Sequence, residues 1–280
     1  MKVHTKVSIK INMKINHKQF NQPNHTYIMG ILNVTPDSFS DGGRFTQLDA
    51  ALQQVERMIS EGADVIDIGG ESTRPGFEAI TIEEEIQRTA RMIEAITARF
   101  DIPVSIDTYK SEVAKAALSV GASMVNDVWG LKHDPKMASV VKEYDVPVCI
   151  MHNRHNMDYH SLLPDMISDL HESIQLATDA GIESNQIILD PGIGFAKTRE
   201  HNLLVMKNLG HFHSLGYPIL LGASRKSMIG LTLDLPVEER LEGTLATTVV
   251  AVLAGCAWVR VHDVKENKRV IQMTEAMRDA

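Results

Sequence analysis

The sequence is poor in cysteine and in positive charge, and each shortage narrows the class of protein. Only two of 280 residues are cysteine, and both Cys149 and Cys256 stand in apolar stretches. We therefore expect buried free thiols in a reducing compartment, with no disulfide and no cysteine metal site. Lys plus Arg is 28 and Asp plus Glu is 36, so the net charge is −8, without the basic excess of a nucleic-acid or anionic-membrane binder.

The sequence also lacks an apolar run long enough to cross a bilayer. The longest one, around Val249 to Val259, is too short to do so. The N-terminus is polar and has no signal-peptide apolar core. With 44% hydrophobic residues, the chain can bury a large core, and we expect a cytoplasmic globular protein.

Short apolar segments rich in β-branched residues recur along the chain, and an amphipathic stretch follows each one. They predict eight strands that are buried on both faces, as in a parallel sheet. The predicted strands are 27–34, 64–70, 103–108, 123–128, 146–152, 187–193, 218–224 and 258–263. Among the predicted helices are 48–60, 82–100 and 237–253.

Eight such units favour an α/β fold of the closed (β/α)8 TIM-barrel type over an open, doubly wound sheet. No G-x-G-x-x-G follows the first predicted strand, which weakens a dinucleotide-binding interpretation. Residues 1–25 lie outside the repeat, and the alternating SIKINMKIN predicts a β-hairpin over the bottom of the barrel. Because no linker-like tract divides the chain, we expect residues 26–280 to form one barrel domain with residues 1–25 as its extension.

Every predicted strand ends in polar residues, and in a TIM barrel these ends meet at the catalytic rim. Converging buried charges cost free energy unless a ligand or partner satisfies them, so the set as a whole favours a functional site. Cationic and donor groups suit a phosphate or diphosphate, whereas the acceptors suit the donor edge of a flat, nitrogen-rich heterocycle. The cationic and donor groups are Arg260, His262 and Lys226, and the acceptors are Asp107, Asn126 and Asp190. Asn33 is a candidate Mg²⁺ ligand together with phosphate oxygens.

Two segments after the first and second predicted strands are long and polar, TPDSFSDGGRF (35–45) and ESTRPGFEAI (71–80). Their composition is compatible with ordinary turns before a helix. Their length favours mobile lids that close over the site and exclude water.

The strings MGILNVTPDSFSDGG, DIGGESTRPG, SIDT, ND, MHNR, LDPGIGFAKT, LLGASRKSMIG and RVHDV occur in this order from Tyr27 to Val264. Together they resemble the dihydropteroate synthase family of folate biosynthesis. The resemblance implies a transferase that joins (7,8-dihydropterin-6-yl)methyl diphosphate to 4-aminobenzoate, giving 7,8-dihydropteroate and diphosphate. It also implies a Mg²⁺ cofactor, sensitivity of the family to sulfonamides, a cytoplasmic homodimer that buries faces of the last helices, and no nucleic-acid or membrane partner.

The resemblance further implies a role for each motif residue. Asp107, Asn126, Asp190, Lys226 and Arg260 would bind the pterin, and Asn33, Arg260 and His262 the diphosphate, with Asn33 also on the metal. The 4-aminobenzoate pocket would comprise Phe39, Thr73, Arg74, Pro75, Phe195 and Ser227. Catalytic roles would fall to Asp41, Lys226 and Arg260.

Two alternatives remain open from the sequence. A pterin-binding methyltransferase barrel would share the Asp and Asn pattern, although it is not expected to combine SFSDGG, STRPG and SRKS. A non-catalytic pterin binder is expected to lose a lid or one of Asp107, Lys226 and Arg260, all of which are present. His152, at the end of a predicted strand, is interpreted as a structural hydrogen-bonding residue, and Asp67 as part of the loop architecture.

Overall fold

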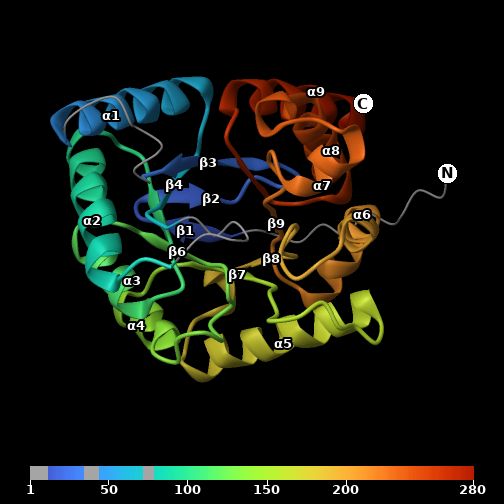
Figure 1. Ribbon diagram of the computed structural model, residues 1–280, viewed down its shortest axis with the longest axis horizontal. Coiled ribbons are helices and arrows are strands. Elements are labelled where there is room, and N and C mark those ends of the chain that lie inside the picture. The colour runs from blue at the N-terminus through green and yellow to red at the C-terminus, as the bar shows by residue number, and fades with distance from the viewer. Residues whose placement is uncertain (1–11, 35–43, 72–78) are drawn as a thin grey trace.

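The computed structural model describes residues 12–34, 44–71 and 79–280, with the backbone alone described for residues 44–47. Eight parallel strands form a ring inside a layer of helices (Figure 1). The strands neighbour one another in the order β8-β7-β6-β5-β4-β3-β10-β9, and Leu189 pairs with Ile219, next to β9, to close the ring. The predicted (β/α)8 TIM barrel is therefore confirmed.

The strands of the ring coincide closely with the apolar segments of the sequence. They are β3 (Tyr27–Asn33), β4 (Val65–Gly69), β5 (Val104–Asp107), β6 (Met124–Asp127), β7 (Val148–Met151), β8 (Ile187–Asp190), β9 (Leu220–Leu221) and β10 (Trp258–Val261). The helices are α1 (Arg44–Glu61), α2 (Ile82–Arg99), α3 (Ser111–Ser119), α4 (Met137–Tyr144), α5 (Leu162–Asp179), α6 (Arg199–Lys207), α7 (Ser227–Leu233), α8 (Leu241–Ala254) and α9 (Val264–Asp279).

One predicted helix is divided. The expected helix 237–253 is a short 3-10 turn, Val237–Glu239, followed by α8, with Arg240 between them. The guanidinium of Arg240 donates to the carbonyls of Leu235 and Arg225 at 3.1 Å, so it ties this junction to the turn after β9. That tertiary contact explains the break in an otherwise helical pattern.

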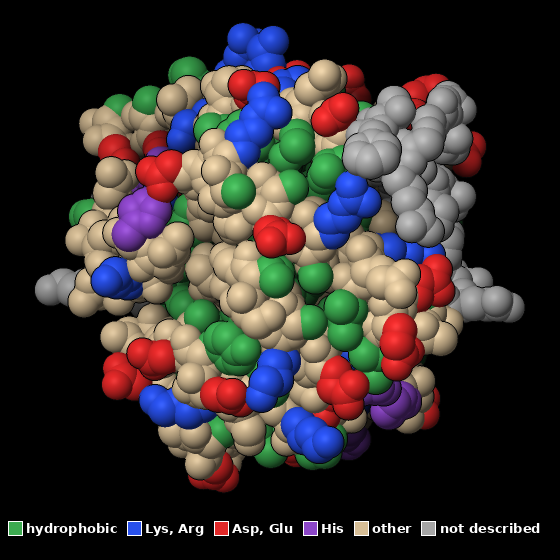
Figure 2. Space-filling model, turned by 90° about the vertical axis from the view of Figure 1, so that its left-hand side faces the viewer, with side chains coloured by type: hydrophobic (Ala, Val, Ile, Leu, Met, Phe, Trp, Pro, Cys, Tyr) green, Lys and Arg blue, Asp and Glu red, His purple; other side chains and the backbone are tan. Residues whose placement is uncertain are grey.

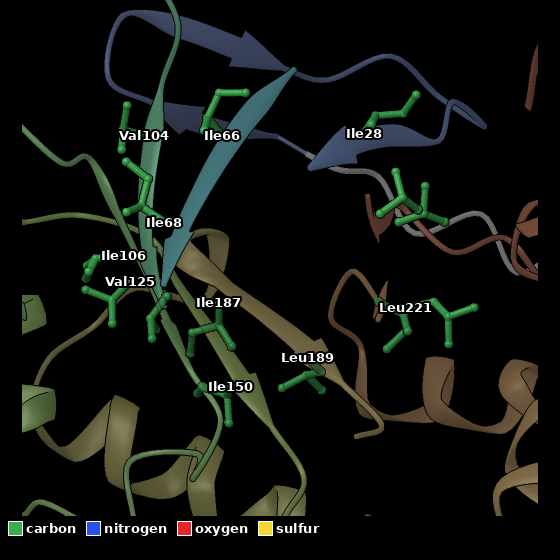
Figure 3. Close-up of a cluster of buried hydrophobic side chains, with 14 of the residues drawn as sticks. Ile28, Ile66, Ile68, Val104, Ile106, Val125, Ile150, Ile187, Leu189 and Leu221 are labelled. Atoms are coloured by element: carbon green, nitrogen blue, oxygen red, sulfur yellow. The ribbon is translucent and has the colours of Figure 1, made fainter. Parts of the chain in front are cut away.

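The outward side chains of the strands form the larger hydrophobic core. Ile28, Ile66, Ile106 and Leu189 are fully buried in it between the barrel and the helices, and Figure 3 shows them on β3, β4, β5 and β8. Burying such side chains contributes about 1.5–3 kcal/mol each, which makes this layer the main source of stability.

The inward side chains at the N-terminal ends of the strands form a second, separate core that the N-terminal hairpin completes. Strands β1 (Met13–Ile15) and β2 (Lys18–Phe20) are antiparallel and are joined through Asn16 and His17, with Asn16 in the left-handed region at φ 55°. Met13, Ile15 and Phe20 are buried in the barrel floor together with Trp258. The predicted hairpin is confirmed, although its second strand lies beyond the alternating SIKINMKIN.

The surface is mixed in charge. Figure 2 shows acidic and basic side chains interspersed with hydrophobic ones on the side of the molecule where α1 and α2 lie. Both cysteines are free and buried, as predicted. Within the described ranges, no helix combines the length and hydrophobicity needed to cross a membrane.

Candidate active site

Directly above the apolar floor, the same strands turn polar side chains into the barrel. Side chains alternate along a strand, so residues two positions beyond the inward-facing Val65, Met124, Ile188 and Trp258 also point inward. Those positions are occupied by Asp67, Asn126, Asp190 and Arg260, and Asp107 ends the neighbouring β5. We call these five residues the polar layer.

Arg260 is the centre of the polar layer. Its Nε donates to Oδ2 of Asp67 at 2.6 Å and its Nη2 donates to Oδ2 of Asp107 at 2.5 Å. Asn126 Nδ2 also donates to Asp67 Oδ2, at 3.1 Å. Burial disfavours the charged guanidinium, but the two carboxylates outweigh it and raise the pKa of Arg260.

Two carboxylates of the polar layer, those of Asp107 and Asp190, are held in an environment that favours their neutral form. Burial raises the pKa of Asp107 to about 7, against the opposing charge of Arg260. Burial likewise raises the pKa of Asp190, against the charge of Lys226. Oδ1 of Asp67 and Oδ1 of Asp107 are buried and have no hydrogen-bond partner among the described residues. Unpaired buried acceptors are costly, so these two oxygens are suited to receive the N–H groups of a ligand.

Lys226 lies at the edge of the same layer, opposite Asp190. A Cβ on Gly222 would lie 3.1 Å from Asp190 Oδ2 and 4.0 Å from Lys226 Nζ, so glycine leaves room for both groups. Nζ of Lys226 donates to the carbonyl of Ile193 and lies 4.4 Å from the centre of the Phe195 ring. Burial lowers the pKa of Lys226 to about 8, while Asp190 favours its charged form.

Two further predicted residues lie at the rim. Asn33 is exposed at the end of β3. Its Oδ1 and Oδ2 of Asp107 both lie close to Gly69, because a Cβ at that position would be 3.9 Å from the first atom and 3.6 Å from the second. His262 Nδ1 is 2.9 Å from the hydroxyl of Ser224, which also accepts the backbone N–H of His262 at 3.2 Å. With the Ser224 hydroxyl donating to Nδ1, the proton of the neutral ring is on Nε2, which makes Nε2 a donor for an anion.

The structure thus brings Asp107, Asn126, Asp190, Lys226 and Arg260 together in the barrel mouth. Phe195 lies beside Lys226, and Ser227 is exposed at the first position of α7. The predicted residues Phe39, Asp41, Thr73, Arg74 and Pro75, and most of both expected lids, lie outside the described residues.

Sequence reasoning missed two residues of this site. Asp67, interpreted as loop architecture, is fully buried in the barrel and holds Asn126 and Arg260. Its position two residues beyond Val65 is the signal that could have identified it. Ser224 is the last residue of the predicted strand 218–224, and its contact with His262 depends on the pairing of β9 and β10, which sequence alone does not give.

No group of three or more His, Cys, Asp or Glu suited to a metal ion is found in the described part of the chain. Asn33 is a single neutral oxygen donor at the rim. Mg²⁺ usually keeps several waters and takes one or two protein ligands beside substrate phosphates, so Asn33 fits an ion that arrives with a phosphate ligand.

Comparisons with known proteins agree on one family. The family model described as "Pterin binding enzyme" matches residues 29–262. A dihydropteroate synthase of Clostridium beijerinckii is 59% identical over 264 residues, which cover 94% of this chain and 98% of that relative. Two solved structures are also similar over nearly their whole length. The dihydropteroate synthase of Clostridium difficile, solved in the presence of pteroic acid, has a TM-score of 0.89 at 51% identity and covers 90% of this chain and 97% of its own. The dihydropteroate synthase of Xanthomonas albilineans, solved with 4-aminobenzoic acid, has a TM-score of 0.91 at 38% identity, and the match covers 97% of this chain and 99% of that one.

The barrel and its polar mouth therefore define a pterin-binding enzyme of the α/β-barrel class. Within that class the chain belongs to the dihydropteroate synthase family, which makes dihydropteroate for folate synthesis. The family resemblance inferred from the motifs is thus confirmed, and the methyltransferase and non-catalytic alternatives are set aside.

Proposed function

We propose that the polar layer binds the dihydropterin ring of the diphosphate substrate. The ring offers amino and amide N–H groups, and Asp107, Asn126 and Asp190 present acceptors to the barrel mouth. The observation that carries the proposal is the buried Oδ1 of Asp107, which has no hydrogen-bond partner among the described residues, while Oδ2 of the same carboxylate is held by Arg260. Lys226 and Arg260 supply the donors, and Asp67 keeps Arg260 and Asn126 in place.

The diphosphate would lie above the ring, toward the rim. Asn33, Arg260 and His262 are the proposed ligands, with Ser224 setting which ring nitrogen of His262 donates. Mg²⁺ is proposed as the cofactor, held by Asn33 together with the diphosphate. When bound, the ion would neutralise negative charge on the leaving group.

The 4-aminobenzoate would lie beside Lys226, next to Phe195 and Ser227. Phe39, Thr73, Arg74 and Pro75 complete this proposed pocket from the two segments outside the described residues. A crystal of a relative with 4-aminobenzoic acid, the Xanthomonas protein, supports a pocket for this substrate in the same fold.

The reaction breaks the bond between the pterin methylene carbon and a diphosphate oxygen, and the electron pair leaves with the diphosphate. The amine nitrogen of 4-aminobenzoate forms the new bond to that carbon and loses a proton. Arg260 and His262 stabilise the leaving charge, whereas the carboxylates of Asp107, Asp190 and Asp41 stabilise positive charge on the pterin. A weakly basic aromatic amine needs no dedicated general base, and neither cysteine is exposed to act as a nucleophile.

We further propose a cytoplasmic homodimer, in which residues 1–25 extend a single barrel domain of residues 26–280. Large exposed hydrophobic side chains on the last helices support an interface between two copies. Val250 and Leu253 lie on α8 and Met273 and Met277 on α9, with Leu253 60% and Met277 61% exposed. A Leu253→Asp, Met277→Lys variant should run as a monomer in light scattering, and an unchanged dimer mass would reject this face.

The proposal is tested by measuring diphosphate release from the dihydropterin diphosphate with Mg²⁺, with and without 4-aminobenzoate. Release should depend on 4-aminobenzoate and yield dihydropteroate. Omission of Mg²⁺ should raise KM for the pterin substrate. Binding of the pterin without any release, by a folded protein, would overturn the catalytic assignments.

A further inference from the structure

The segment after β8, residues 191–197, determines where Lys226 lies. The carbonyl of Ile193 accepts a hydrogen bond from Lys226 Nζ, and the ring of Phe195 lies beside the same nitrogen. Gly192 and Gly194 have φ of 70° and 85°, and Ala196 has φ of 46°. The left-handed region is unfavourable for alanine, so surrounding contacts must hold this backbone in place.

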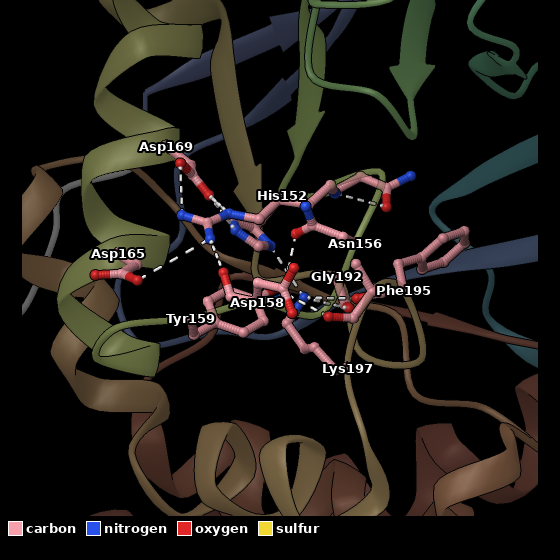
Figure 4. Close-up of polar contacts among 12 residues, drawn as sticks. His152, Asn156, Asp158, Tyr159, Asp165, Asp169, Gly192, Phe195 and Lys197 are labelled. Atoms are coloured by element: carbon pink, nitrogen blue, oxygen red, sulfur yellow. Dashed lines mark hydrogen bonds and ion pairs between the residues drawn. The ribbon is translucent and has the colours of Figure 1, made fainter.

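Lys197 supplies those contacts from inside the protein. Its Nζ lies 3.0 Å from the carbonyl oxygen of Gly192, 2.9 Å from that of Phe195 and 3.0 Å from Nδ1 of His152. The residue is only 8% exposed. Figure 4 shows its side chain beside His152 and Gly192. The protonated form of Lys197 has three N–H donors, and the three acceptors around Nζ match them in number. Burial lowers the pKa of Lys197 to about 7, against the charge of Asp190.

His152 is held in turn by Asp169. Nε2 of His152 lies 2.8 Å from Asp169 Oδ2, and Arg154 pairs with both oxygens of the same carboxylate. Burial lowers the pKa of His152 to about 4, so its ring is neutral near pH 7. A neutral ring that donates from Nε2 to Asp169 has an acceptor at Nδ1, the atom next to Lys197.

We propose that Lys197 is a positioning residue that fixes the backbone of residues 192–195. Lys197 is held in turn by His152 and Asp169. The fixed backbone places Ile193 and Phe195 so that they position Lys226 and shape the 4-aminobenzoate side of the site. Lys197 itself touches neither substrate. The inference rests on the proposed function, which assigns Phe195 to 4-aminobenzoate and Lys226 to the pterin.

The decisive variant is Lys197→Met, which keeps the length of the side chain and removes the donors. KM for 4-aminobenzoate should rise about tenfold, because each lost carbonyl contact of this kind shifts an equilibrium by roughly that factor. The affinity for the dihydropterin diphosphate, measured without 4-aminobenzoate, should change much less, since three of the proposed partners of the pterin, Asp107, Asn126 and Arg260, are fixed on strands. Lys207→Met, at the exposed end of α6, is the matched control and should leave both values unchanged.

A milder variant covers the case in which Lys197→Met fails to fold. Tyr159 donates from its hydroxyl to the carbonyl of Ala196 at 3.0 Å, so Tyr159→Phe loosens the same segment without removing a buried charge. KM for 4-aminobenzoate should rise by a smaller factor in this variant, with thermal unfolding little changed. If both variants fold and neither raises KM for 4-aminobenzoate, or if Lys197→Met weakens both substrates equally, the positioning role is wrong.

Phe195→Ala separates this inference from the proposal on which it rests. If that variant leaves KM for 4-aminobenzoate unchanged, the assignment of Phe195 fails. If Phe195→Ala raises KM and folded Lys197→Met does not, Lys197 alone loses its role.

Discussion

The lower and upper halves of the barrel interior are built on the same strands yet have opposite chemistry. Below, Met13, Ile15 and Phe20 of the hairpin pack on an apolar floor. At the next level, β4, β5, β6, β8 and β10 contribute carboxylates, an amide and a guanidinium to the interior, with two carboxylate oxygens unpaired among the described residues. A barrel can carry this costly polar layer because stability comes from the floor and the outer core, so the mouth is available for binding.

Substitutions in the polar upper half of the barrel interior should have the largest effect, and that effect should be on enzymatic activity. Lys226→Ala and Asp107→Asn should each lower kcat/KM by about 10²–10³, because each removes a fixed group directed at the proposed substrate. The unfolding midpoint of Asp107→Asn in urea should not fall, since the substitution removes a buried carboxylate that lies near the carboxylate of Asp67. The matched controls are Lys207→Ala and Asp49→Asn, at exposed positions on α6 and α1. Near-normal turnover in either site variant would contradict the residue assignment.

A substitution in the apolar floor should have the opposite result, with a loss of stability and no loss of activity. Phe20 is 4% exposed, and its ring lies 5.0 Å from that of Tyr27 and 4.9 Å from that of Trp258. Phe20→Ala should lower the free energy of unfolding by about 3–5 kcal/mol and leave kcat and KM almost unchanged at a temperature where the protein is folded. Leu204→Ala, on the exposed side of α6, should have little effect on either. A tenfold loss of kcat in Phe20→Ala would mean that the two halves are coupled.

A smaller effect should appear in the pH dependence of pterin binding. Burial raises the pKa of Asp107 to about 7 and lowers that of Lys226 to about 8. Below the first value Asp107 takes up a proton, so it loses its negative charge and part of its acceptor capacity, and above the second Lys226 loses its charge. Affinity for pteroic acid should therefore be highest between these values and fall by up to about tenfold per pH unit on either side.

Calorimetric titrations from about pH 6 to about pH 9 would measure this profile. The acidic limb should disappear in Asp107→Asn, and the alkaline limb should remain. A profile that is identical in wild type and variant would assign the acidic limb to another group.

Much of this architecture could be predicted because local pattern and global fold agree. The eight strands follow from apolar β-branched runs, and α2 begins where the side chain of Thr81 accepts the N–H of Glu84 before three consecutive glutamates. The polar strand ends could be placed at one rim because parallel strands share a direction. The second hairpin strand and the break at Arg240 could not be predicted, since the first packs Phe20 on Trp258 and the second depends on the contact of Arg240 with the Arg225 carbonyl.

In the candidate site, too, the residues that depend on tertiary contacts could not be predicted from the sequence. The motif residues of the barrel mouth lie at strand ends, where their type and position suffice to suggest a role. The contacts of Lys197 are made with backbone carbonyls and with His152, 45 positions away in the sequence, so no pattern of residue types reveals them. Groups that bind a ligand leave a signature in the sequence, whereas groups that hold other groups often do not.

The most direct test of the account is the affinity of Asp107→Asn for pteroic acid, measured by calorimetry beside its free energy of unfolding in urea. We expect binding weakened by about 10² or more with unchanged or increased stability. Wild-type affinity in this variant, or a loss of stability that matches the loss of binding, would contradict the claim that the polar layer serves the ligand and not the fold.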